Sequence, residues 1–205
     1  GLKRQFMMGC QWPSDYYARI RVRSKKTGEE VWEWAGFALP HEYMAAFARV
    51  GQKEKLLSKD GLDAETLSIL EENETVAGEP LAALGIWCDG VPVNWDRSES
   101  VEVVSLNLPG QDDRWKNLRM PVIALSRKQI GPHTFDDIFT VLVWSLQACA
   151  AGVHPQQRHD DSAWLPSDAR RSRSSVRGSS TRVRSALVQL RGDWKMYAET
   201  FRLPK

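Results

Sequence analysis

The sequence has few cysteines, no long apolar segment and almost no excess of charge of either sign. Its three cysteines, Cys10, Cys88 and Cys149, lie far apart, which fits neither a disulfide framework nor the paired spacing of a zinc site. We expect reduced core thiols in an intracellular protein. The 28 Lys and Arg residues nearly balance the 26 Asp and Glu residues, so overall composition gives no sign of a nucleic-acid-binding domain.

Membrane segments and a secretory signal are also not expected. The most apolar long stretch, residues 138–151, is shorter than the roughly 20 residues that span a bilayer, and it begins beside Asp136 and Asp137. No apolar run follows the basic residues at the N-terminus. With 42% hydrophobic residues, the chain has enough apolar material for one good core.

The first 80 residues predict a small α+β region. Residues 16–23 alternate apolar and basic side chains, which is typical of a strand with one solvated face, and a turn sequence separates them from a second strand around residues 31–34. A helix is expected after Pro40, and a weaker one over residues 63–72. Turn-forming residues cluster at 73–80, so we place a domain boundary there.

Residues 81–205 predict three strands, a helix and a fourth strand. The strands are expected at 84–88, 101–108 and 120–125, the helix from Thr134, and the last strand at 186–190. The first strand is apolar throughout, which is typical of a central strand. Pro121 lacks a backbone N–H, which places the third strand at an edge or at a strand start. Thr134 is expected to cap the helix, with Asp136 and Asp137 in its first turn.

This order is the opening order of the ribonuclease H-like fold, an α/β fold with a mixed sheet. Its first three strands are antiparallel, and a helix then crosses over so that the fourth strand lies parallel to the first. Asp89 directly follows the first strand and Asp193 directly follows the fourth, so the fold would bring these two carboxylates together. Two carboxylates suit Mg²⁺ or Mn²⁺ and phosphodiester chemistry. Spacing alone leaves other interpretations open, because Asp89-Gly90 is also a hairpin-turn sequence and Gly192-Asp193 also suits a strand end.

Two blocks of sequence carry a resemblance to a known family. The first runs from Cys88-Asp89-Gly90 to Asn107-Leu108-Pro109, and the second is the apolar strand that ends at Gly192-Asp193-Trp194. Residues 84–204 resemble the catalytic region of CACTA-type (En/Spm) and Plavaka-like DDE transposases, first half only. The resemblance implies that Asp89 and Asp193 are catalytic metal ligands. It also implies DNA as the partner, a possible homo-oligomer and nuclear localisation.

The resemblance leaves part of the chain unexplained. The third acid of the family lies well downstream, beyond Lys205, so we expect a fragment of a DNA-cleaving and DNA-joining enzyme that lacks this residue. Residues 1–83 match nothing in the family. The Arg/Ser-rich insertion at 155–184 replaces a more compact stretch.

The insertion is a candidate nucleic-acid-binding segment. Its composition cannot form a core and predicts flexibility. A solvated, phosphorylated loop is an equal alternative to phosphate contact. The candidate residues for DNA contact are Arg170, Arg171, Arg173, Arg177, Arg182 and Arg184.

Several other features have ordinary structural explanations. His154, His159, Asp160 and Asp161 lack regular zinc spacing and are expected in a loop. Asp96 and Glu99 are loop acids, and Asp136 and Asp137 are explained by the start of the helix. The tryptophans are expected in the core, although stacking on bases is an alternative. They include Trp32, Trp34, Trp87, Trp95, Trp144 and Trp194.

Two further functions remain open. A domesticated or decayed copy would bind DNA or protein without catalysis and keep Asp89 and Asp193 for structure. Another ribonuclease H-like nuclease would share the same two acids.

Overall fold

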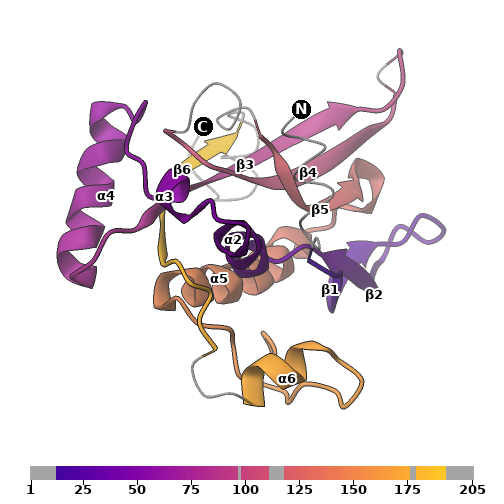
Figure 1. Ribbon diagram of the computed structural model, residues 1–205. Helices are drawn as coiled ribbons and strands as arrows, with labels where there is room; N and C mark the ends of the chain where they lie inside the picture. The colour runs from indigo at the N-terminus through magenta and orange to yellow at the C-terminus, as the bar shows by residue number, and fades with distance from the viewer. Residues whose placement is uncertain (1–12, 97, 111–117, 176–178, 193–205) are drawn as a thin grey trace.

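The computed structural model describes residues 13–96, 98–110, 118–175 and 179–192. It is an α/β structure with a mixed four-stranded sheet and a separate two-stranded antiparallel sheet (Figure 1). The chain order is β1, β2, α2, α3, α4, β3, β4, β5, the 3₁₀ helix η1, α5, α6 and β6.

The N-terminal hairpin consists of β1 (Tyr16–Arg23) and β2 (Glu30–Phe37). Every second residue of β1 is buried, from Tyr16 to Val22, as the alternation predicts. Gly28 closes the turn with φ +75, a backbone conformation that favours glycine. The predicted hairpin is therefore confirmed.

Three helices follow the hairpin, α2 (Pro40–Arg49), α3 (Lys53–Leu56) and α4 (Ala64–Ala77). Pro40 opens α2, where its missing N–H costs nothing. The carboxylate of Asp63 accepts a hydrogen bond from the Thr66 backbone N–H and thereby caps α4. Both predicted helices are present, and α4 is longer than expected.

The four-stranded sheet has the order β5-β4-β3-β6. Its strands are β3 (Ala82–Pro92), β4 (Ser100–Asn107), β5 (Met120–Ser126) and β6 (Ser185–Gly192). The first three are antiparallel neighbours, and β6 lies parallel to β3. The expected central position of β3 and the edge position of β5 are both confirmed. β3 extends beyond Asp89 to Pro92, so Asp89-Gly90 is not the hairpin turn.

Helix α5 (Thr134–Ala151) makes the crossover from β5 towards β6 and lies alongside α2 beneath the sheet (Figure 1). Gly152 follows the last residue of α5 and has a left-handed φ of 69, the conformation expected of a glycine that ends a helix. The predicted cap is wrong, because His133 holds the N-cap position. The Thr134 hydroxyl instead donates to the Arg21 carbonyl and accepts from the Gly131 N–H.

Asp137 lies in the first turn of α5, as expected, and has a further role. Its carboxylate accepts hydrogen bonds from the backbone N–H and the guanidinium of Arg21, at 2.6–2.9 Å. Through these bonds β1 is fixed to the first turn of α5. The acid therefore joins two elements, in addition to lying at the favourable end of a helix.

A single large core crosses the predicted boundary at residue 80. It contains Tyr16 and Phe47 from the N-terminal region together with Leu84 and Leu142 from the sheet and α5. A second, smaller cluster joins α4 to β3 and β6. The first 80 residues are therefore packed into the same core as the sheet.

The segment between α5 and β6 has more fixed structure than its composition predicts. Within the part that is described, it contains the short helix α6 (Arg170–Ser175). Trp164, Arg170 and Val183 are buried. The expectation of a flexible segment without core contacts is wrong for these residues, because apolar and paired side chains anchor the loop.

The cysteines and tryptophans give a mixed outcome. Cys88 and Cys149 are free and buried, as expected, and burial raises the pKa of the Cys88 thiol to about 12. Cys10 lies outside the described residues. Trp144 packs against the core, but Trp32, Trp34 and Trp95 are exposed, so a core position is wrong for these three.

Candidate active site

Asp89 lies in the central strand β3, and its side chain is exposed. It follows the buried residues that fix β3 between β4 and β6. Among the residues that the structure describes, no hydrogen-bond or ion-pair partner is found for its carboxylate. A solvated carboxylate without a partner on a rigid strand is suited to bind a cation.

The pairing of β3 with β6 bears directly on the second predicted acid. Cys88, the residue before Asp89, pairs with Gly192, the residue before Asp193. The expected parallel neighbours are therefore present, in a register that ends one residue before each acid. Asp193 itself lies outside the described residues, and its proximity to Asp89 stays a prediction.

A basic and aromatic cluster, which the sequence analysis missed, is formed by Trp87 of β3, Arg191 of β6 and Arg119, the residue before β5. The Arg119 guanidinium lies 4.3 Å from the centre of the Trp87 ring, and Arg191 pairs with Trp87 across β3 and β6. Burial and the nearby charge of Arg191 lower the pKa of Arg119. Trp87 is two residues before Asp89, so both side chains lie on one face of β3. These cations suit a phosphate beside the carboxylate. Alternation along β3 and β6 is the sequence signal that could have placed Trp87 and Arg191 on this face.

Further along the same face, the sheet contains buried amide groups. The Asn107 side chain lies close to Gly85. A Cβ atom on residue 85 would be 2.5 Å from Oδ1 of Asn107. Oδ1 of Asn107 and Oε1 of Gln189 are buried without a hydrogen-bond partner in the described structure. The Gln189 amide donates to Thr66 in α4. Asn107, part of the first resemblance block, thus packs against the strand that carries Asp89.

The loop acids have local partners. The Asp96 carboxylate accepts from the Ser98 N–H, which lowers the pKa of Asp96. Lys128 pairs with Glu99 at 2.8 Å and lowers the pKa of Glu99. Both acids lie in or beside the β3–β4 hairpin loop, and these contacts account for them without chemistry at the site.

The two histidines named above lie in the predicted loop after α5. Nδ1 of His159 lies 2.6 Å from the Tyr16 hydroxyl, and the His154 ring packs edge-on against His41. Burial is the main cause that lowers the pKa of His159. Within the described ranges, no group of three or more His, Cys, Asp or Glu residues could hold a metal ion.

Two of the candidate arginines are engaged in structural contacts. Arg170 is 7% exposed and forms a two-pronged ion pair with Glu42, with both N–O distances 2.9 Å. Arg184 donates to the Ala150 carbonyl at the end of α5 and to Glu79. The hydrogen bonds to Glu42 occupy one edge of the buried Arg170 guanidinium, so this group is not available to bind a DNA phosphate.

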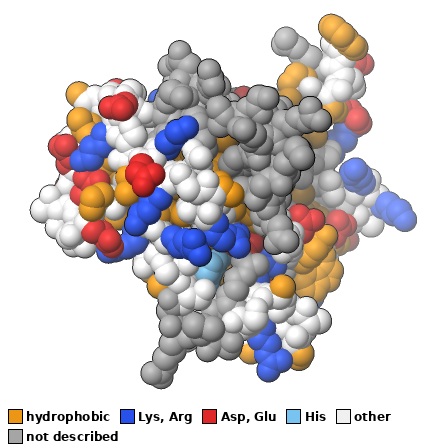
Figure 2. Space-filling view, viewed as in Figure 1, with side chains coloured by type: hydrophobic (Ala, Val, Ile, Leu, Met, Phe, Trp, Pro, Cys, Tyr) orange, Lys and Arg blue, Asp and Glu red, His pale blue; other side chains and the backbone are white. Residues whose placement is uncertain are grey.

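The other candidate arginines are placed differently. Arg171 and Arg182 are exposed, and a hollow of about 510 Å³ beside α3 is lined by Lys53, Arg182 and Arg184. Figure 2 shows Lys and Arg side chains gathering across the middle of the visible face. Arg177 and the Arg173 side chain lie outside the described residues.

Comparisons with protein-family models, curated proteins and solved structures find no match. Among the described residues, no helix is long and apolar enough to cross a membrane.

Proposed function

We propose that this chain is part of a ribonuclease H-like catalytic core of a DDE-type DNA transposase, with Asp89 and Asp193 as metal ligands. The observation that carries the proposal is the parallel pairing of β3 and β6, with Cys88 opposite Gly192. The mixed sheet order β5-β4-β3-β6 supports it. DNA as the partner, a homo-oligomer and nuclear localisation are part of the same proposal and rest on the resemblance.

One of the two proposed ligands of the divalent cation, Asp89, lies among the described residues. Asp89 offers an exposed hard oxygen ligand, and the described part of the chain contains no competing partner for its carboxylate. Bound Mg²⁺ or Mn²⁺ would supply activation of a water or hydroxyl and stabilisation of the leaving oxygen. The protein would hold Asp89 on the rigid β3 strand and place Arg119 and Arg191 where phosphate oxygens can be bound.

The test is the binding of Mn²⁺ to the full chain and to two variants, Asp89→Asn and Asp193→Asn. Each substitution removes one of two charged ligands, so the affinity for Mn²⁺ is expected to fall at least about tenfold. Asp96→Asn is the matched control, because Asp96 is an exposed acid with a local partner. Titration calorimetry measures the affinities, and circular dichroism verifies folding.

The outcome also separates the alternatives. Loss of Mn²⁺ binding in both variants, with the control unchanged, supports a shared metal site. Equal binding by wild type and Asp89→Asn overturns the catalytic assignment. If DNA binding persists in that case, the non-catalytic module becomes the better proposal. The cluster of Arg119 and Arg191 beside Trp87 is the observation that favours this module.

A further inference from the structure

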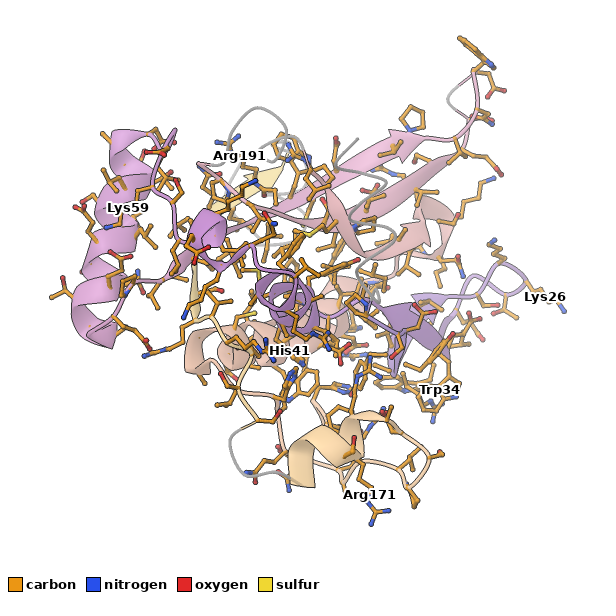
Figure 3. All side chains as sticks on the ribbon, viewed as in Figure 1. Lys26, Trp34, His41, Lys59, Arg171 and Arg191 are labelled. Carbon is orange, nitrogen blue, oxygen red and sulfur yellow. The ribbon has the colours of Figure 1, made fainter. Side chains whose placement is uncertain are left out.

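The outer face of the β1–β2 hairpin carries large aromatic and basic side chains in alternation. We call it the Trp–Arg face, and it consists of Tyr17, Arg19, Arg21, Arg23, Trp32 and Trp34. Arg19 lies opposite Trp34, and Arg21 lies opposite Trp32. Figure 3 shows Trp34 on the side of the hairpin away from the four-stranded sheet.

The aromatic rings on this face are not accounted for by the core. Tyr17, Trp32 and Trp34 are 53%, 52% and 65% exposed, while the opposite face of the hairpin is buried against α5 and the core. Rings of this size gain most of their stabilisation from burial, so their exposure side by side on a strand pair points to an interaction surface.

Most charges of the face are cationic; Glu30 lies opposite Arg23 at its end, where it is paired with His133. Arg21 is held by Asp137, but Arg19 and Arg23 are exposed and have no carboxylate partner among the described residues. The guanidinium groups of Arg19 and Arg21 lie 5.8 and 5.3 Å from the centre of the Trp32 ring. The Trp32 ring therefore has two cations next to it, and Arg19 also lies opposite Trp34 in the strand pair.

Beside the face is a hollow of suitable size for a planar polar group. It measures about 360 Å³ and lies between β2, α5 and the loop at residues 158–160. Trp32 and Trp34 form an aromatic wall, and Thr140, Arg158 and Asp160 supply hydrogen-bonding groups. An aromatic wall with a few convergent polar groups matches the stacking and edge contacts that hold an unstacked base.

We propose that the Trp–Arg face binds single-stranded nucleic acid. Bases stack on Trp32 and Trp34, one base enters the hollow, and Arg19 and Arg23 contact backbone phosphates. Sheets that bind single strands combine the same two elements, exposed aromatic rings and a basic surface. A peptide or membrane surface would require a wider apolar patch than this alternation of rings and guanidinium groups provides. The proposal does not depend on metal chemistry at Asp89.

The test is the binding of a fluorescein-labelled oligothymidine of about 12 nucleotides, a length within the usual site size. Fluorescence anisotropy measures its affinity for the full chain at low salt without divalent metal. Trp32→Ala and Trp34→Ala are each expected to weaken binding about 5- to 150-fold, the effect of losing one stacked base. Arg19→Gln is expected to lower the dependence of affinity on salt by about one counterion.

A control variant isolates the face. Trp95→Ala removes an exposed tryptophan from the other hairpin and is expected to leave the affinity unchanged. The assay contains no divalent metal and the substituted residues lie on the β1–β2 hairpin, so failure of the metal site at Asp89 is distinguishable from failure here. Circular dichroism verifies that each variant folds, which is expected because the substituted side chains are exposed.

Four results would overturn the proposal. One is wild-type affinity in both Trp32→Ala and Trp34→Ala. Another is an equal loss in Trp95→Ala, which would show that any exposed ring serves. The third is tighter binding of a duplex of the same length, because its bases are already stacked. The fourth is binding to phosphatidylserine vesicles, lost in the same two variants, without measurable binding of the oligonucleotide.

Discussion

At the scale of single residues, the buried ion pair of Glu42 and Arg170 shows how an Arg/Ser-rich segment is fixed to the core. Arg170 also donates to the Ser14 carbonyl and lies over the Tyr16 ring at 5.4 Å. Its contacts therefore join α6, α2 and the start of β1. A buried charge of this kind is tolerated only while its partner is present.

Glu42→Gln removes the closer of two partner charges, with Asp168 remaining 3.6 Å from Arg170. The free energy of unfolding is expected to fall by up to about 3–5 kcal/mol. Urea denaturation measures this change. The matched control is Glu99→Gln, because Glu99 and Lys128 form an exposed pair with side chains 56% and 62% accessible. The control is expected to unfold like wild type. An equally small effect of both substitutions would show that the pair of Glu42 and Arg170 is not stabilising.

His159 predicts a dependence of stability on pH. Burial lowers the pKa of His159 and raises that of Tyr16, so the 2.6 Å hydrogen bond between the Tyr16 hydroxyl and His159 Nδ1 joins two neutral groups. The unfolded chain takes up a proton near pKa 6.5, but the folded chain does so only at lower pH. The contribution of this group to stability is therefore fully present above 6.5 and is lost as pH falls through the folded pKa.

The expected result is that wild type loses more stability than His159→Gln when the pH is lowered from about 7.5 to about 5.5. The Gln amide oxygen can still accept from Tyr16 and does not titrate. Urea midpoints at the two pH values measure the difference. Parallel losses in both proteins would contradict the assignment to His159.

At the scale of elements, glycine ends two helices in the same conformation but in different surroundings. Gly78 after α4 has φ +70 and open space around a Cβ, whereas a Cβ on Gly152 after α5 would lie 2.6 Å from Cγ of Arg184. Arg184 is held there by Ala150 and Glu79. The end of α5 is thus packed more tightly than the end of α4.

Gly78→Ala is expected to cost about 1–2 kcal/mol of stability, the usual cost of a left-handed L-residue. Gly152→Ala is expected to cost more, because the Arg184 side chain must also move. Thermal unfolding of both variants measures the difference. Equal destabilisation would show that Arg184 moves aside without loss.

At the scale of the whole molecule, the N-terminal region and the sheet share one core. Phe37 and Phe47 pack in the same cluster as Leu106 and Ile138. The Ala38 N–H also donates to the Val122 carbonyl in the edge strand β5. The two parts are therefore expected to fold together.

Unfolding by urea is expected to give coincident transitions in circular dichroism and tryptophan fluorescence. A chain that begins at residue 81 is expected to lose cooperative unfolding, because it exposes the apolar surfaces of α5 and β5. Two separate transitions in the full chain, or a cooperative transition in the shortened one, would contradict this.

The sequence determined the local elements because their signals are local. The alternation from Tyr16 to Arg23, the proline at the start of α2 and the glycine after α5 each fix a conformation within a few residues. The order of the later elements, together with the crossover rule, also predicted that β6 lies parallel to β3.

The predictions failed where distant residues compete for the same side chain. Asp137 lies in the first turn of α5 as predicted, but its pairing with Arg21 was not foreseen. Arg170 suits phosphate contact by composition, but Glu42 binds it inside the core. Trp32 and Trp34 are hydrophobic, yet strand alternation places them on the outer face of the hairpin once Ala35 and Phe37 turn inward.

The sequence by itself determined the strands, the helices α2, α4 and α5 and the position of Asp89 after an apolar run, because these depend on short-range patterning. Only the tertiary structure decided which charges are paired and which rings are exposed. It also placed Arg119 over Trp87, in the strand that carries Asp89. Those outcomes depend on packing between segments far apart in the chain, which no local pattern specifies.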